Sequence, residues 1–175
     1  DAMFGQEELW RYREGNRLEL KEAQGGLPRS FWETYSSFAN TQGGLIVLGA
    51  AEKSDGTMRA IGIANLEALR RDLWNGLNNE QKVSANLLLD SDITQESIDG
   101  KSLLLVYVPR ADRTLRPVYI NDNPKRGSFR RNGDGDYHCT AEELRAMARD
   151  SAEGATDKLV LTAIDLDALS AETIG

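Results

Sequence analysis

Two apolar runs, Leu45–Leu48 and Leu103–Val108, constrain the fold of this chain more than any other feature. Leu45-Ile-Val-Leu48 is apolar at every position, as is typical of a central strand buried on both faces. The second run stops at Pro109, which cannot donate to the hydrogen-bonding ladder of a sheet. Both runs are far shorter than the roughly 20 residues that span a bilayer. The first run predicts a strand at the centre of the sheet, the second predicts a further strand, and neither predicts a membrane segment.

Weaker patterns surround these two runs. Alternation in Arg17–Lys21 predicts a half-buried strand with Leu18 and Leu20 on one face and Glu19 on the other. Further strands are expected at 58–63, 83–89, 118–120 and 128–131, and helices at 28–40, from Asn65 to Leu77 and after the capping box of Thr140 and Glu143. Turns at 53–56 and 99–100 join neighbouring strands. These turns are too short for parallel crossovers.

The predicted fold class is therefore α+β, with a mixed, mostly antiparallel sheet and helices packed on it. A chain of 175 residues that is 40% apolar can bury one core, so we expect one domain over residues 1–150. Residues 151–157 are expected to be a linker, and 159–169 a short docking element or the start of a connector, within a final segment 151–175.

The single cysteine and the first residues of the chain indicate a compartment. Cys139 has no partner for an intrachain disulfide, which favours a reducing environment. The sequence DAMFGQEELW lacks the long apolar region of a secretory signal. We expect a cytoplasmic location.

Charge is distributed unevenly along the chain. The net charge of −7 argues against indiscriminate coating of nucleic acid. A basic segment nevertheless holds seven basic and two acidic residues; the basic ones are Arg110, Arg113, Arg116, Lys125, Arg126, Arg130 and Arg131. From Cys139 onward, three basic residues face eight acidic ones. The basic segment is either a phosphate-binding face or ordinary salt-bridged surface.

Common nucleotide-binding and catalytic motifs are missing from the sequence. Neither a P-loop nor a Gly-x-Gly-x-x-Gly sequence is present, so no motif supports ATP binding. His138 has no neighbours that suggest a catalytic triad or a zinc site. Cys139 is expected to be a packing residue.

The turn Asn40-Thr-Gln-Gly-Gly44 joins a predicted helix to a central strand. Paired glycines permit a positive φ and a close approach of the backbone. The turn is either a helix C-cap or an anion-binding site made by the backbone amides of Thr41, Gly43 and Gly44.

Three glutamates lie beside predicted strands. Glu14 precedes one strand, Glu19 lies on it, and Glu52 follows the central strand. If these strands are neighbours, the carboxylates converge and could hold Mg²⁺ or Mn²⁺; the alternative is a set of solvated surface acids. Lys21 is expected to neutralise one of them or to contact a phosphate.

Four stretches together resemble the Schlafen AlbA-like family, formerly called the divergent AAA domain. They are Glu14-Gly-Asn-Arg-Leu-Glu-Leu-Lys21, Phe38-Ala-Asn-Thr-Gln-Gly-Gly44, Leu48-Gly-Ala-Ala-Glu52 and Phe129-Arg-Arg-Asn-Gly133. The resemblance covers roughly residues 7 to 150. It implies the N-terminal domain of a bacterial transcriptional regulator, with an ATPase-like fold and a winged helix downstream.

The resemblance to the animal Schlafen proteins implies a metal-dependent endoribonuclease site with three carboxylates. Glu14 and Glu19 match the first two acids, whereas Glu52 stands where aspartate is usual. The Arg-x-Gly element of the family corresponds to Arg131-Asn-Gly133.

The sequence thus predicts a domain of a transcriptional regulator that binds DNA or RNA through the basic segment and Lys21. One alternative is an endoribonuclease using Glu14, Glu19 and Glu52. The other is a protein-interaction or homo-oligomerisation module. No cofactor is expected apart from the Mg²⁺ or Mn²⁺ of the nuclease alternative.

Overall fold

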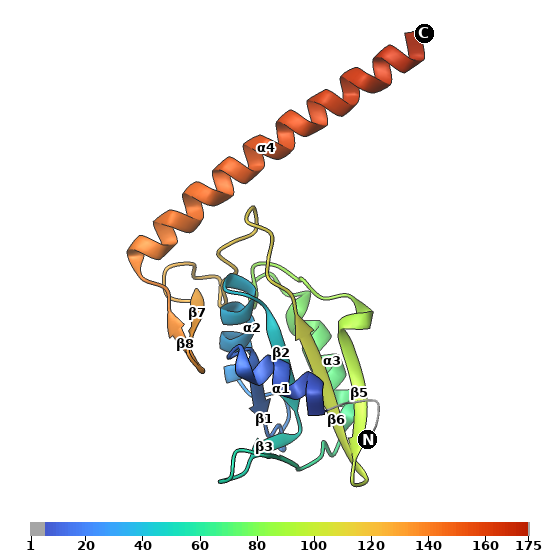
Figure 1. Ribbon diagram of the computed structural model, residues 1–175, viewed down its shortest axis with the longest axis vertical. Helices are drawn as coiled ribbons and strands as arrows, with labels where there is room; N and C mark the ends of the chain where they lie inside the picture. Colours follow the sequence, from blue (N-terminus) through green and yellow to red (C-terminus); the bar gives the residue numbers. More distant parts are fainter. Residues whose placement is uncertain (1–5, 175) are drawn as a thin grey trace.

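The computed structural model describes residues 6–174, and it gives the side-chain surroundings of residues 7–160. Its elements are α1 (Gln6–Glu14), β1 (Leu18–Lys21), α2 (Ser30–Asn40), β2 (Gly44–Leu48), β3 (Ala50–Glu52), β4 (Met58–Ala60), α3 (Leu66–Leu77), a 3₁₀ turn (Asp90–Asp92), β5 (Ile93–Ile98), β6 (Lys101–Val108), β7 (Phe129–Asn132), β8 (Gly135–His138) and α4 (Ala141–Ile174). The expected α+β fold is confirmed (Figure 1).

The main sheet has the strand order β1-β2-β6-β5. β1 and β2 are parallel because α2 crosses between them, and the other two pairs are antiparallel. The first apolar run forms the central strand β2, as predicted, and the second forms β6, which is also central. Two hairpins, β3–β4 and β7–β8, form separate two-stranded sheets.

Alternation along the strands gives the sheet two apolar faces. Ile46 and Leu104 belong to the larger cluster, together with residues of α2 and α3. Leu45 and Leu105 belong to a smaller cluster that includes Leu9 of α1. Figure 1 shows the sheet between α1 and the pair of helices α2 and α3. Glu19 and Lys21 alternate with the residues of β1 that enter the smaller cluster, so they lie on the α2 side.

Some expected elements differ in the structure. The strand expected at Val83–Leu89 is wrong, since only Val83 forms an isolated bridge, to Ile120. The segment still buries Leu88 in the core, which accounts for its apolar character. The strand that pairs with β6 is β5, and Asp99-Gly100 forms the turn between them. The expected strand at 118–120 is reduced to isolated bridges, and β8 was not predicted.

α4 begins where the capping box predicts. The Thr140 N–H donates to Glu143 Oε1 at 2.8 Å, and the Glu143 N–H donates to Thr140 Oγ1 at 3.1 Å. The helix then continues through 151–157, the segment expected to be a linker, and extends away from the sheet (Figure 1). Within residues 6–174, none of the helices is long and apolar enough to cross a membrane.

Candidate functional site

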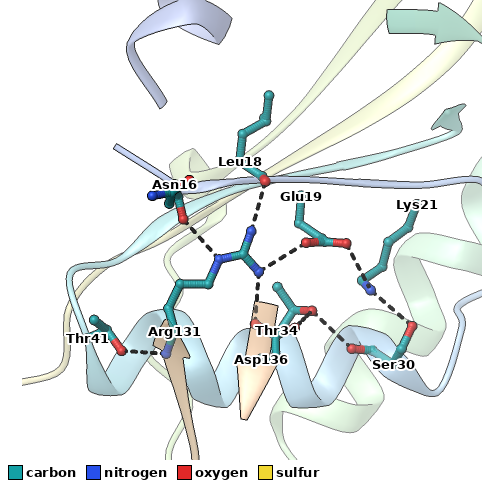
Figure 2. Close-up of polar contacts among 9 residues, drawn as sticks. All are labelled: Asn16, Leu18, Glu19, Lys21, Ser30, Thr34, Thr41, Arg131 and Asp136. Carbon is teal, nitrogen blue, oxygen red and sulfur yellow. Dashed lines mark hydrogen bonds and ion pairs between the residues drawn. The ribbon is translucent and has the colours of Figure 1, made fainter. Parts of the chain in front are cut away.

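Arg131 on β7 lies at the centre of a polar network that joins the β7–β8 hairpin to β1 (Figure 2). Its side chain is 5% exposed. Nη1 donates to Glu19 Oε1 at 3.0 Å and to Asp136 Oδ1 at 2.9 Å. Nε donates to the carbonyl of Asn16 at 2.9 Å, and Nη2 to that of Leu18 at 3.1 Å. Each guanidinium nitrogen therefore has a partner within the protein, so Arg131 is placed to hold the fold together rather than to face a phosphate.

A second set of contacts supports the carboxylates around Arg131 (Figure 2). Thr34 of α2 donates its hydroxyl to Asp136 Oδ2 at 2.6 Å. Lys21 Nζ lies 3.9 Å from Glu19 Oε2 and donates to Ser30 Oγ at 3.0 Å. Lys21 thus neutralises Glu19, which was one of the two roles expected of it.

Asn40, at the end of α2, forms hydrogen bonds to Val118 and Phe129, the two ends of the segment 118–129 that leads into β7. Its side-chain oxygen accepts from the Val118 N–H at 2.7 Å, and its Nδ2 donates to the carbonyls of Val118 and Phe129, each at 2.9 Å. Ser36 Oγ donates to Val118 O at 2.7 Å and accepts from the Phe129 N–H at 3.0 Å. A buried asparagine with these partners is structural.

The turn after α2 ends the helix and also forms a hydrogen bond to β7. The N–H groups of Thr41 and Gly43 donate to the Phe38 carbonyl, at 3.2 and 2.6 Å. Thr41 Oγ1 accepts from the backbone N–H of Arg131 at 2.9 Å. Gly43 has a φ of +73°, whereas the φ of Gly44 is not positive. Because two of its amides are occupied, the turn fits the C-cap interpretation better than the anion-binding one.

The three glutamates do not come together. Glu19 and Glu52 line one cavity of about 320 Å³, along with Arg131. Glu14, at the end of α1, lines a different cavity beside Trp10. Among residues 7–160, no group of three or more His, Cys, Asp or Glu side chains is placed to hold a metal ion. The predicted ligand set therefore does not fit Mg²⁺ or Mn²⁺ in this arrangement.

Part of the basic segment pairs with α4. Arg130 Nε lies 3.0 Å from Glu143 Oε2, and Arg116 Nη2 lies 3.8 Å from Asp150 Oδ2. Arg113 also pairs with acids of this helix. Arginines 113, 116 and 130 thus form the salt-bridged surface that was the alternative interpretation of this segment.

The remaining cations of the segment are exposed. Lys125 and Arg126 lie in the loop before β7 and line an open cavity of about 560 Å³ together with Arg145 of α4. None of the ion pairs formed by residues 7–160 includes any of these three cations, nor Arg110, which is exposed after Pro109. Arg145 was missed by sequence reasoning because it lies outside the basic segment and joins it only in the fold.

Cys139 is buried, as expected of a packing residue. Burial raises the pKa of its thiol to about 11, which keeps it protonated and unreactive near neutral pH. The neighbouring His138 packs on Phe129, with ring centroids 4.4 Å apart.

The family model described as Schlafen, AlbA_2 matches residues 14–140. The chain belongs to this family. The Schlafen AlbA_2 region runs from the end of α1 to the N-cap of α4, so it includes the Arg131 network and Asn40 but leaves α4 outside.

Solved structures with a similar fold include the following two proteins. The N-terminal domain of a RecG-related protein from Nitrosomonas europaea is 32% identical, with a TM-score of 0.54 over 77% of this chain and 90% of that chain. The DIP2311 protein from Corynebacterium diphtheriae is 20% identical, with a TM-score of 0.52 over 78% of this chain and 24% of that chain, and shows the fold alone. The search of curated proteins gave no match.

Proposed function

We propose that this Schlafen AlbA_2 domain binds nucleic acid, with Lys125, Arg126 and Arg145 in contact with backbone phosphates. The observation that carries the proposal is that these cations line one open cavity and that no carboxylate of residues 7–160 pairs with them. Cations of this kind attract phosphates and release condensed counterions when they bind. The name of the Nitrosomonas relative, which refers to the DNA helicase RecG, supports a nucleic-acid partner.

The experiment compares two triple variants of equal charge change. One replaces Lys125, Arg126 and Arg145 by glutamine; the other replaces Lys53, Arg71 and Lys101, which are also exposed. Binding of short fluorescein-labelled DNA and RNA is measured by anisotropy across a salt series. We expect the first variant alone to lose affinity and to flatten the salt dependence by about 0.7–0.9 in log–log slope per lost phosphate contact.

If both variants weaken binding equally, the attraction comes from overall charge and the proposed face is wrong. If the wild type binds neither DNA nor RNA, the protein-interaction alternative takes its place.

We propose binding without cleavage, because the three glutamates do not form a metal site. Structured RNA incubated with the domain and Mn²⁺ should stay intact. Robust cleavage that disappears in both Glu14→Gln and Glu19→Gln would overturn this proposal in favour of the endoribonuclease.

A role in transcriptional regulation, in the cytoplasm, is the finer proposal. It requires a preference among DNA sequences beyond phosphate contacts. Selection from a random duplex library should enrich a defined sequence, and an unenriched library would contradict the regulatory role. Fractionation of the native host should recover the protein with the cytoplasm, and recovery with secreted proteins would contradict that location.

A further inference from the structure

Three carboxylates of α4 that pair with the basic segment are spaced seven residues apart. They are Glu143, Asp150 and Asp157. Seven residues are close to two helical turns, so the three lie on one side of the helix. One side of the helix therefore carries a row of carboxylates that pair with arginines of the basic segment.

The middle of α4 rests on the loop at 112–116. Arg113 Nη1 lies 4.0 Å from Asp150 Oδ1, and its Nη2 pairs with Asp157. Ser151 Oγ donates to the Thr114 carbonyl at 2.9 Å. Gly154 permits this contact, since a Cβ there would lie 2.9 Å from side-chain atoms of Arg113 and Thr114.

Arg110, Arg113 and Arg116 form a group of like charges. The pKa of the Arg116 guanidinium is lowered by burial and then by the nearby charge of Arg110, with a smaller contribution from Arg113; Asp150 acts in the opposite direction. Such a group needs anions beside it. The anions that α4 supplies are half exposed, with side chains of Asp150 and Asp157 that are 50% and 64% accessible. Pairs this exposed are weak and open to exchange.

We propose that Arg113 and Arg116 form a second phosphate-binding site, which Asp150 and Asp157 of α4 occupy until nucleic acid displaces them. A phosphate offers a guanidinium the same paired oxygens as a carboxylate, with more negative charge. The side of α4 and a nucleic-acid backbone therefore compete for one surface, so that binding loosens the helix from the loop at 112–116. This inference rests on the proposed function.

The test uses the full chain and two double variants of equal charge change on the same helix. Asp150→Asn with Asp157→Asn removes the competing carboxylates. Glu142→Gln with Glu153→Gln is the control, because no ion pair of residues 7–160 includes these exposed acids. The probe is the same fluorescein-labelled DNA and RNA. We expect the aspartate variant to bind at least about five-fold more tightly than the control, in the range of typical coupling between sites.

A second step assigns the gain to the arginines. Adding Arg113→Gln and Arg116→Gln to the aspartate variant should abolish the gain, since the exposed site is then gone. A gain no larger than that of the control, or one that survives loss of both arginines, would overturn the inference. Misfolding cannot imitate the expected result, because an unfolded variant loses affinity.

The two proposals fail in different ways. If Lys125, Arg126 and Arg145 prove necessary for binding while the aspartate variant matches its control, only the second site is wrong. If the wild type and the aspartate variant both fail to bind DNA and RNA, the proposed function and this inference fall together.

Discussion

Arg126 and Arg131 belong to the same basic segment and have opposite environments. Arg131 is buried, with its guanidinium bonded to two carboxylates and two carbonyls. Arg126 is exposed at the rim of an open cavity, and among residues 7–160 its one hydrogen bond is made by its backbone N–H, to Asn123 Oδ1. Local charge in the sequence therefore does not reveal the role of an arginine; the partners that the fold supplies do.

The largest effect should come from Arg131→Gln. This change leaves Glu19 and Asp136 close together without the cation between them, and we expect a loss of about 3 kcal/mol in the free energy of unfolding. Arg126→Gln is the matched control and should change stability by less than about 0.5 kcal/mol. Urea unfolding measures both. Equal stability of the two variants would remove the distinction between them.

Gly44→Ala should cost about 2 kcal/mol, through overpacking rather than backbone strain. A Cβ at Gly44 would lie 2.6 Å from the ring of Phe38. The Arg131 guanidinium carbon lies 4.9 Å from the centroid of that ring, so a displaced ring would also disturb the buried arginine. The positive φ that the paired glycines permit occurs at Gly43 and not at Gly44.

Gly25→Ala is the control for this substitution, because a Cβ there has nothing within 4 Å and φ is not positive. Thermal unfolding of both variants checks the prediction. A Gly44→Ala protein as stable as Gly25→Ala would show that Phe38 can move aside without cost.

Thr41→Val should have the smallest of these effects, about 1 kcal/mol, because it removes the acceptor for the Arg131 N–H while keeping the shape of the side chain. Thr41→Ser retains the hydroxyl and should restore most of the stability. If valine and serine behave alike in urea unfolding, the hydrogen bond makes no net contribution.

Those parts of the fold that carry one strong local sequence signal could be predicted. The apolar run Leu45–Leu48 identified a central strand, and Asn65 caps α3 by accepting from the Ala68 N–H at 3.1 Å, as a helix start signal predicts. Leu18 and Glu19 lie on opposite sides of β1, as their alternation predicts. These features depend on neighbours in the chain.

Features that depend on distant residues were harder to predict. The sequence of β5, ITQESI, is polar at most positions because the strand lies at the edge of the sheet, so its apolar signal is weak. β8 had a signal that was not used: Gly133-Asp134 is a two-residue hairpin loop, since Asn132 pairs with Gly135. That hairpin brings Asp136 to Arg131, and without it the arginine looks available for a phosphate.

A titration followed by ¹H–¹⁵N NMR, with attention to arginine side-chain Nε–H signals, tests the central claim most directly. Labelled protein receives unlabelled oligonucleotide. We expect the Nε–H signals of Arg126 and Arg145 and the backbone signals of 121–126 to shift most. The Arg131 Nε–H, bonded to the Asn16 carbonyl, should stay in place. Shifts centred on Arg131 and β1, with Arg126 and Arg145 unmoved, would contradict the assignment of the exposed cations to the nucleic-acid interface.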